Sequence, residues 1–393
     1  MARSGSNDTS EPLRVAVIGA GWAGCTAARV LHDEGCTAHV FEAGHAVGGH
    51  SRAASVNGVL FELEGPHIFH TSNPDVARFV QRFGMRRPYV HHSLTEVILD
   101  DDTDESIILS WPLQVEELRN LPTWEAVEKE LAACPPRPGG ENLESYCVSM
   151  RGPTLYRLFI EGYTMKQWGR HPSDLSSRFA PSRLDLRTDG DRRLFRDSWE
   201  FFPADGPQAT IENITRPLPV TFGQHVRLPD VEDLHREFDA VVITAPLDDF
   251  VGVEGALEWR GIRSVSQHLP LDDPAATVTP GYVVNQPSLR RAYTRTVETK
   301  HATGQTAPGT VVTREYPGAP RRHYPVPTVD MRYERRDAEL QDEIRSRSPL
   351  VPFFCGRLAN YTYVNQDVAI GQGMITAREV LAHFGRRIGG GHR

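Results

Sequence analysis

The chain has 393 residues, with 43 Lys and Arg against 51 Asp and Glu, so its formal net charge at pH 7 is −8. This length predicts two or three domains with a large buried core. A hydrophobic fraction of 39% with 24% charged residues excludes a disordered or fibrous chain. The acidic total argues against nucleic acid as a partner. No apolar run approaches the roughly 20 residues that span a bilayer, so we expect no membrane partner.

The five cysteines are scattered along the chain without any CxxC spacing. Their odd number and their spacing argue against a disulfide framework or a zinc site, so we predict no metal and a cytoplasmic location. Residues 1–12 contain no apolar segment. This start predicts a polar, disordered tail rather than a signal peptide.

The first structured segment is predicted to be a strand, a helix and a second strand. Leu13–Ile18 has the composition of a strand buried on both faces, and Ala38–Phe41 is a second short apolar run. Between them, Cys25–Asp33 has helical composition and ends near Gly35, a suitable C-cap. The segment therefore predicts a βαβ unit.

A glycine turn of the form GxGxxG joins the first strand to the helix, with glycines at Gly19, Gly21 and Gly24. The first glycine permits the tight turn, the second lets backbone N–H groups approach a pyrophosphate, and the third permits close packing of helix on strand. Glu42 follows the second strand, where it can accept a hydrogen bond from a ribose hydroxyl. A carboxylate there disfavours NADP. The alternative is a glycine turn without any nucleotide.

A second glycine pair closely follows the acidic residue and ends at Gly49, with Arg52 three residues later. A second close backbone approach suits a cofactor that lies extended across the domain, and Arg52 can contact its phosphate. This combination favours FAD over NAD and resembles the FAD-binding amine-oxidase-like flavoproteins.

The rest of the chain predicts helices first and strands later. Helical periodicity extends from Asn73 to about Trp168, interrupted by the Pro- and Gly-rich residues 135–140. Further predicted elements are the strands Ala240–Thr244, Gly309–Thr313 and Val351–Phe354 and a final helix, Asp367–Ala382.

Three segments carry a more specific resemblance. They are GPHIFHT at residues 65–71, EGYTMKQWG at residues 161–169 and GRLANY at residues 356–361, with weaker echoes in AYTR at residues 292–295 and REYP at residues 314–317. In this order they resemble the UDP-galactopyranose mutase family over nearly the whole chain.

The resemblance implies an α/β fold with three parts. We expect a Rossmann-like FAD-binding domain from residues 1–80, 208–250 and 340–393. A helical domain from residues 81–180 is inserted into it, and an antiparallel sheet domain that binds substrate comes from residues 181–207 and 251–339.

The activity that the resemblance implies is the interconversion of the pyranose and furanose rings of a nucleotide sugar, which is the work of an isomerase. The FAD must be reduced, and in this family its N5 atom is thought to attack the anomeric carbon. An external reductant is then needed. Family analogy also predicts a homodimer.

The resemblance also implies roles for individual residues, beginning with the reacting centre. Arg183 and Arg295 match arginines that hold the diphosphate, since guanidinium groups are always charged and bond phosphate oxygens in pairs. Tyr316 and Tyr361 match tyrosines at the diphosphate and the sugar. His70 is expected beside the flavin, where it orients the flavin or tunes N5.

The nucleotide is expected on an aromatic surface. Tyr156, Phe159 and Tyr163 recur on one helix face, which in most proteins indicates core packing. In the family, the positions that match Phe159, Tyr163 and Trp168 line the uridine pocket, where a base stacks on a ring. Asn285 matches a residue that can bond to the diphosphate or ribose.

The resemblance places three further residues near the flavin. His67 is expected to assist His70, and Arg357 lies in the GRLA turn. Asp367 opens the last helix, whose N-terminus can support the negative charge of a reduced flavin. The HxxH spacing of the two histidines is also found in metal sites, but no third ligand stands at a sensible spacing.

The chain departs from the family pattern at Leu194, Trp199 and Pro66. Leu194 stands where the family has a tyrosine that contacts the diphosphate. These departures leave the sugar and the nucleotide open, and a deoxysugar is one possibility. Two other functions are also open: an FAD-dependent oxidoreductase of the amine-oxidase-like superfamily, and a flavoprotein that binds a nucleotide without catalysis.

Overall fold

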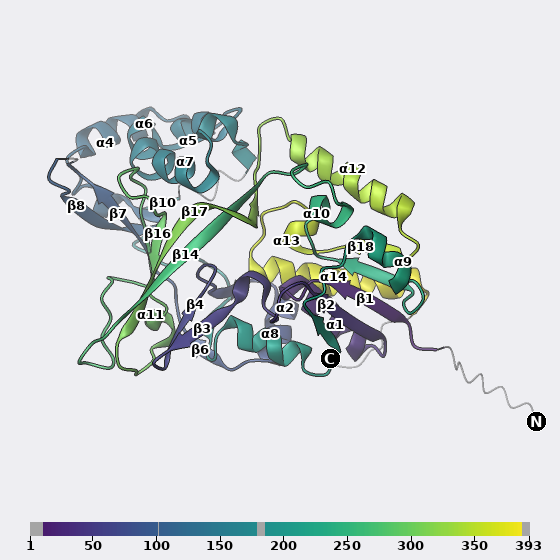
Figure 1. The fold of residues 1–393 in the computed structure, drawn as a ribbon. Coiled ribbons are helices and arrows are strands. Elements are labelled where there is room, and N and C mark those ends of the chain that lie inside the picture. Colours follow the sequence, from purple (N-terminus) through teal and green to yellow (C-terminus); the bar gives the residue numbers. More distant parts are fainter. Residues whose placement is uncertain (1–10, 101, 179–184, 387–393) are drawn as a thin grey trace, which may run out of the picture.

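The computed structural model describes residues 11–100, 102–178 and 185–386. Figure 1 shows three regions in one molecule: a parallel sheet between helices at the right, a group of helices at the upper left, and long strands that run between the two.

The described chain contains runs of strands, runs of helices and stretches where the two alternate. The strands are β1 Arg14–Ile18, β2 Thr37–Glu42, β3 Ala53–Val56, β4 Val59–Glu62, β5 Phe69–Thr71, β6 Arg86–Pro88, β7 Ser93–Ile98, β8 Ser106–Trp111, β9 Leu113–Gln114, β10 Leu186–Arg187, β11 Trp199–Pro203, β12 Val220–Phe222, β13 Ala240–Ile243, β14 Trp259–Leu269, β15 Val283–Asn285, β16 Arg295–Val297, β17 Thr310–Pro325 and β18 Val351–Phe354. The helices are α1 Trp22–Asp33, α2 Pro74–Gln81, α3 Val115–Leu118, α4 Trp124–Ala133, α5 Leu143–Arg151, α6 Pro153–Leu155, the π-helix η2 Tyr156–Glu161, α7 Gly162–Trp168, α8 Pro207–Thr215, α9 Val231–Leu234, α10 Leu247–Val251, α11 Lys300–Thr303, α12 Arg332–Arg347, α13 Gly356–Ala359 and α14 Gln366–His383, with short 3₁₀ turns between some of them.

The parallel sheet has five strands in the order β12-β2-β1-β13-β18. In β1, Val15 and Val17 belong to the core on one face of the sheet, and Ala16 and Ile18 belong to the core on the other face. Because both faces are covered, the consecutive residues Val15–Ile18 are all apolar. This is the reason for the continuous apolar run in the sequence.

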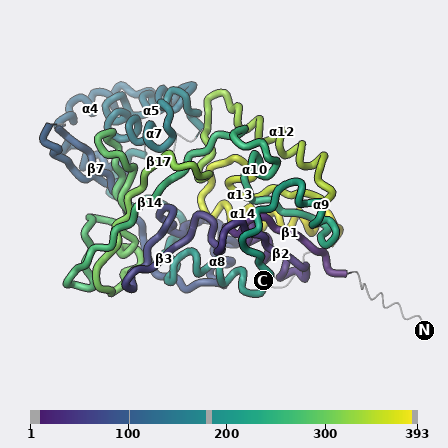
Figure 2. Tube along the Cα trace, viewed as in Figure 1, coloured from purple at the N-terminus to yellow at the C-terminus, as the bar shows by residue number. Residues whose placement is uncertain are grey.

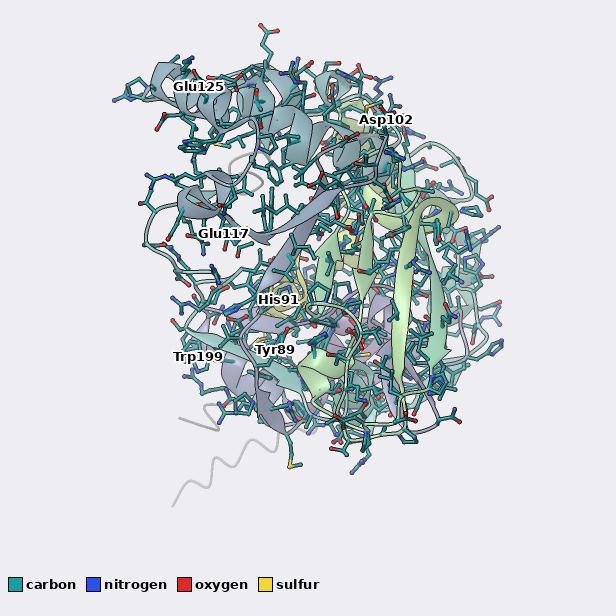
Figure 3. All side chains as sticks on the ribbon, turned by 90° about the vertical axis from the view of Figure 1, so that its left-hand side faces the viewer. Tyr89, His91, Asp102, Glu117, Glu125 and Trp199 are labelled. Carbon is teal, nitrogen blue, oxygen red and sulfur yellow. The ribbon has the colours of Figure 1, made fainter. Side chains whose placement is uncertain are left out.

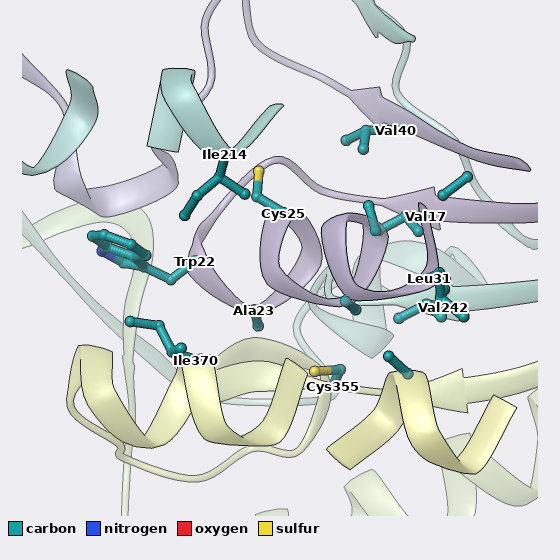
Figure 4. Close-up of a cluster of buried hydrophobic side chains, with 14 of the residues drawn as sticks. Val17, Trp22, Ala23, Cys25, Leu31, Val40, Ile214, Val242, Cys355 and Ile370 are labelled. Atoms are coloured by element: carbon teal, nitrogen blue, oxygen red, sulfur yellow. The ribbon is translucent and has the colours of Figure 1, made fainter. Parts of the chain in front are cut away.

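Helices α1 and α14 cover one face of this sheet. Figure 4 shows Val17 and Val242 from the strands beneath α1, with Trp22 and Leu31 on that helix and Ile370 on α14. The two helices, which lie at opposite ends of the sequence, are neighbours in the trace of Figure 2. The other face is covered by α9, α10 and α12.

The predicted βαβ unit is confirmed as β1, α1 and β2. Gly35 has φ +83 and follows the end of α1, as expected for a glycine at a helix C-terminus. Among the later predictions, Val351–Phe354 is β18, Ala240–Thr244 corresponds to β13, and the final helix is α14.

The prediction of continuous helical periodicity from residue 73 to 168 is wrong between residues 86 and 111. This part forms β6, β7 and β8. Ser93, Thr95 and Val97 of β7 are buried while the residues between them are partly exposed, a period of two that belongs to a strand. Ser and Thr at buried positions hide this alternation when only hydrophobic residues are counted.

The long strands belong to a second, six-stranded sheet with the order β14-β17-β16-β15-β7-β8. The predicted antiparallel sheet is thus mixed, since β15 pairs with β7 in parallel while the other neighbours are antiparallel. The strand predicted at residues 309–313 continues to Pro325, because β17 pairs along its length with the long strand β14.

The three segments predicted for the cofactor domain supply all five strands of the parallel sheet: β1 and β2, then β12 and β13, then β18. We keep the boundaries of the three domains as a proposal. The five cysteines are free. Within the described residues, no helix combines the length and the apolar character needed to cross a membrane.

Helix α12 carries a carboxyl group on its buried side. Asp337 is 4% exposed and lies near Asp248, which is fully buried. Burial, with contributions from Asp248 and Glu334, raises the pKa of Asp337 to about 7, although a hydrogen bond from Gln341 lowers it. The native protein therefore keeps a proton on this group up to about neutral pH.

We expect Asp337→Asn to stabilise the protein more at pH 8 than at pH 5. Above the folded-state pKa the wild type must bury an ionised carboxylate, whereas at acidic pH the native carboxyl is protonated and the penalty shrinks. Thermal unfolding at the two pH values measures the difference. The control is Asp342→Asn on the exposed side of the same helix. An equal shift at both pH values would contradict the burial of a protonated group.

Candidate active site

A cavity of about 710 Å³ lies where the three regions of the fold meet. Residues that are far apart in the sequence line it: His70 from β5, Tyr163 from α7, Asn285 from β15, Arg295 from β16 and Arg357 from α13. Its size lies in the range of ligand and cofactor sites. Eight of the 18 predicted site residues line this cavity: His67, His70, Phe159, Tyr163, Trp168, Asn285, Arg295 and Arg357.

The glycine turn shows different constraints at its three glycines. A Cβ atom on Gly24 would lie 2.1 Å from the carbonyl oxygen of Gly19, and one on Gly19, at φ +104, would lie 2.2 Å from Oγ1 of Thr244. Both glycines are therefore required by packing. A Cβ on Gly21 would meet only Gly49, at 3.9 Å, so Gly21 is open on the side where a ligand would approach.

The N-terminus of α1 suits an anion. Gly21 is its N-cap, and no side chain caps the helix, so its first N–H groups remain available for a phosphate. Glu42 stands next to this turn, where its two carboxylate oxygens accept hydrogen bonds from the backbone of Ala20 (2.8 Å) and Gly44 (2.7 Å). The carboxylate is thereby held in place with lone pairs left for ribose hydroxyls. The residues fit an ADP-containing cofactor.

Arg52 contacts a protein carboxylate. It forms an ion pair with Glu64, which also accepts from Arg321 at 2.8 Å and from Nδ1 of His50 at 2.9 Å. The ring of His323 stacks on that of His50 with 4.1 Å between centroids. Burial alone would raise the pKa of Glu64, but hydrogen bonds from His323, His50 and Arg52 lower it. Glu64 thus competes with phosphate for Arg52.

Two groups of side chains in the described part of the chain could hold a metal ion. His50, Glu64 and His323 offer ligand atoms within 4.8 Å of one another, as do Glu144, Glu161 and His171. In the first group, the two guanidinium groups on Glu64 oppose a cation. The HxxH pair predicted near the flavin belongs to neither group.

Both histidines of the HxxH pair line the cavity. The backbone N–H of His67 donates to Glu62 at 2.7 Å, and its Nδ1 lies 3.3 Å from the same carboxylate. The ring of His70 stacks on Phe195 with 3.5 Å between centroids, and its Nδ1 lies 2.7 Å from Asp197.

Arg295 is held by an acidic partner beneath the cavity. Its Nε donates to the fully buried carboxylate of Glu315, and its NH2 lies close to Gly65 at the cavity wall. Burial alone would lower the pKa of Arg295, but the charge of Glu315 raises it well above the ordinary value. The terminal nitrogens of a permanently charged guanidinium are thus aimed at the cavity. Arg183, the second predicted arginine, lies outside the described residues.

The aromatic residues predicted for the nucleotide lie on one side of the cavity. Phe159, Tyr163 and Trp168 line it, whereas Tyr156 is buried and does not. The predicted regular helix is a π-helix at residues 156–161, followed by α7. Asn285 also lines the cavity, and its amide donates to Ser93 Oγ (3.1 Å) and Leu94 O (3.0 Å).

The two predicted tyrosines lie outside the cavity. The hydroxyl of the buried Tyr361 donates to the carbonyl oxygen of Glu258 and accepts from the backbone N–H of Val326 at 3.0 Å. Tyr316 packs edge-on against the ring of Tyr293, with the guanidinium of Arg263 over its face. Neither tyrosine lines the cavity, and their contact with substrate stays a prediction.

Tyr324 and Tyr363 line the cavity in their place. Their rings stack with 5.3 Å between centroids, and Arg357 lies 5.2 Å and 5.0 Å from the two centroids. Arg357 also donates to the carbonyl oxygen of Val364. Tyr363 lies two residues beyond Tyr361, just after the GRLANY motif.

Asp367 lies in the first turn of α14, next to the cavity rather than on its wall. Its neighbours Gln366 and Val368 line the cavity. One carboxylate oxygen of Asp367 is buried without a hydrogen-bond partner. This is the kind of group that a bound ligand can satisfy.

Leu194 and Pro66, two of the departures from the family pattern, do line the cavity, but Trp199 does not. Trp199 lies on β11, where it pairs with Thr71. His91, which the sequence did not single out, lines the cavity and is 1% exposed. Burial lowers its pKa to about 3, so it is neutral. Figure 3 labels Trp199 and His91 in the same part of the molecule.

The geometry defines a class of protein. It has a Rossmann-type parallel sheet of the dinucleotide-binding kind and a cavity lined by an arginine and aromatic side chains. A family model described as NAD(P)-binding Rossmann-like domain matches residues 17–83, and one described as UDP-galactopyranose mutase matches residues 158–363, more than half of the chain. The chain belongs to the UDP-galactopyranose mutase family. It is therefore a mutase, an isomerase of a flavin-dependent family.

Individual relatives agree over most of the chain. A probable UDP-galactopyranose mutase of Klebsiella pneumoniae is 27% identical, with 94% of each chain covered. A dTDP-fucopyranose mutase of Escherichia coli is 25% identical, covering 91% of this chain and 95% of the relative. The fold matches a crystal structure of reduced UDP-galactopyranose mutase with a TM-score of 0.76 at 16% identity, covering 94% of this chain and 96% of the other.

The lysine of the GYTMKQWG motif has a structural task. The three N–H donors on Nζ of Lys166 are shared among four backbone carbonyl oxygens, those of Gln286, Ser288, Arg291 and Tyr293, at 2.5–3.0 Å. It thereby connects α7 to the loop between β15 and β16. Arg295 is the first residue of β16. The motif holds two walls of the cavity together.

We expect Lys166→Met to lower the free energy of unfolding by about 2–3 kcal/mol, because charge-assisted hydrogen bonds to buried carbonyl groups are lost. Chemical denaturation measures this value. The control is Lys129→Met, which removes an exposed i,i+4 ion pair and is expected to cost about 0.5 kcal/mol or less. Equal effects of the two substitutions would contradict the role assigned to Lys166.

Proposed function

We propose that this protein is an FAD-dependent mutase that interconverts the pyranose and furanose forms of a nucleotide sugar, with UDP-galactose or a related nucleotide sugar such as a deoxysugar as substrate. The observation that carries the proposal is the cavity itself. In it, the guanidinium of Arg295 is held by Glu315 and shares the cavity wall with aromatic side chains.

The ADP part of the cofactor would lie on the first βαβ unit. Gly21 and the N-terminus of α1 would hold its pyrophosphate, and Glu42 would accept from its ribose. His67, His70 and Arg357, which line the cavity, would hold the flavin. When bound and reduced, FAD supplies the nucleophile of the family's reaction.

Arg295 would hold the diphosphate of the substrate. A departing diphosphate gains negative charge and must stay nearby for the return step. A guanidinium that is always charged, and whose direction is set by Glu315, suits both needs without reorganisation. The proposed role of Arg183 is the same.

Phe159, Tyr163 and Trp168 would form the nucleoside side of the cavity, with the base stacked on a ring and Asn285 beside the sugar phosphates. Tyr324 packs edge-on against Trp168, with 6.1 Å between centroids, and stacks on Tyr363 next to Arg357. With substrate bound, these rings would limit the access of water to a reaction that must keep its open-chain sugar from diffusing away. The needed external reductant, the homodimer and the cytoplasmic location remain predictions.

The decisive experiment incubates dithionite-reduced protein with UDP-galactopyranose, dTDP-fucopyranose and other UDP-, GDP- and dTDP-sugars. Furanose products at catalytic amounts of reductant support the mutase. Consumption of oxygen or another acceptor in proportion to product would indicate the oxidoreductase instead. If reduced flavin is present and no sugar of the panel gives a ring-contracted product, the proposal is wrong.

Arg295→Lys is expected to lower kcat/KM on the order of 100-fold, since the ammonium group keeps the charge beside Glu315 but loses paired bonds to phosphate oxygens. FAD content should not change. The matched control, Arg345→Lys on the exposed face of α12, should leave both values unaffected. Normal turnover in Arg295→Lys would remove this residue from the proposed site.

Gly21→Ala and Gly24→Ala separate cofactor binding from packing. A methyl group at Gly21 fits the protein, because that residue has φ −84 and an open Cβ position, but it would obstruct the pyrophosphate. We expect Gly21→Ala to lose FAD while the apoprotein keeps its unfolding temperature. Gly24→Ala should lose FAD and should also lower the unfolding temperature of the apoprotein. The FAD-to-protein ratio and thermal unfolding of the apoproteins are the measurements, and full FAD in Gly21→Ala would contradict the proposed site.

A further inference from the structure

His70 is held on three sides by side chains from other parts of the chain. Its ring is parallel to that of Phe195, with 9° between the planes, so the ring plane is set by stacking. Nδ1 lies 2.7 Å from Oδ2 of Asp197, and Nε2 lies 3.5 Å from the amide nitrogen of Asn365. Asn365 lines the cavity, so Nε2 is the ring atom on the cavity side.

The two polar neighbours require the same tautomer. A carboxylate only accepts hydrogen bonds, so Nδ1 must carry the proton that it donates to Asp197. An amide nitrogen only donates, so Nε2 must offer a lone pair toward Asn365. A neutral ring with Nδ1–H satisfies both, and a ring with Nε2–H satisfies neither.

Asp197 is itself anchored. Its Oδ1 accepts from the hydroxyl of Ser72 at 2.5 Å, and the backbone N–H of Ser198 donates to the same hydroxyl at 3.3 Å. Burial alone would raise the pKa of Asp197, but hydrogen bonds from Ser72 and His70 lower it, so this group is an ionised acceptor. The Arg side chain next to it in sequence, Arg196, pairs with Asp189 and Asp191.

From this geometry we propose that Asp197 is a positioning residue for the mutase reaction: it holds His70 as the Nδ1–H tautomer and so presents Nε2 to the cavity as a proton acceptor. The inference rests on the proposed function, because it needs a sugar substrate in the cavity that His70 lines. Interconversion of the two rings takes a proton from the hydroxyl that closes the new ring and gives one to the oxygen that leaves the old ring, with no net change. A nitrogen acceptor with a set direction suits a step of this kind.

The test replaces Asp197 with Ala in the full-length, FAD-loaded protein. Loss of the acceptor frees the ring to take up the other tautomer, and we expect kcat to fall on the order of 10- to 100-fold with KM within about two-fold of wild type. Asp189→Ala is the matched control, because Asp189 lies in the same segment and its ion pair within the described residues is with Arg196. It should keep wild-type kcat and KM.

The tautomer is measured separately, by ¹⁵N NMR of histidine-labelled protein, with the His70 signal assigned through His70→Gln. We expect Nδ1–H in the wild type and in Asp189→Ala, and a loss of this tautomer in Asp197→Ala. An unchanged tautomer or an unchanged kcat in Asp197→Ala would overturn the inference. If the wild type shows the Asp197-dependent tautomer but no mutase activity, the proposed function fails, and with it the assignment of Asp197 to that reaction.

Discussion

Close contacts between backbones at glycines determine how the cofactor region is built. Gly24 lets α1 approach the carbonyl oxygen of Gly19, and a Cβ on Gly49 would lie 3.1 Å from Cα of Gly21, so the second glycine pair reaches the first turn. On the outer side of α1, a Cβ on Gly373 would lie 2.5 Å from the carbonyl oxygen of Ala23. The last helix therefore packs against the first, and its N-terminus comes to the cavity wall.

The charge of the cavity differs from the charge of the whole chain. A net charge of −8 argues against a polyanion such as nucleic acid, yet it says nothing about a small diphosphate. Around the cavity, Glu315 and Glu64 each hold cationic side chains in fixed directions. Arg295 pairs with Glu315 through Nε, and its terminal nitrogens point to the cavity. Arg52, in contrast, forms an ion pair with Glu64 through a terminal nitrogen. Whether an arginine can serve an anion thus depends on its carboxylate partner.

Much of the fold could be predicted from local patterns. Val15–Ile18 is apolar at every position because both faces of β1 are covered, and the glycines after it fit one kind of turn. The strands between residues 86 and 111 could not be found in this way. In β7 the buried positions include Ser93 and Thr95, which a hydrophobic pattern does not count, and their burial depends on a sheet assembled from distant segments.

The sequence by itself determined the cofactor unit, the family and most of the segments that reach the cavity, because glycine spacing, short-range apolar patterns and motifs are local properties. Only the tertiary structure decided which side chain of a segment faces the cavity. In the GRLANYTY segment, Tyr361 is turned into the core and Tyr363 to the cavity, since the chain passes through φ +42 at Tyr361. The fold likewise decided the partners of His70 and Arg295. Residues that pair over a long distance in sequence have no fixed spacing, so the sequence pattern does not reveal the pair.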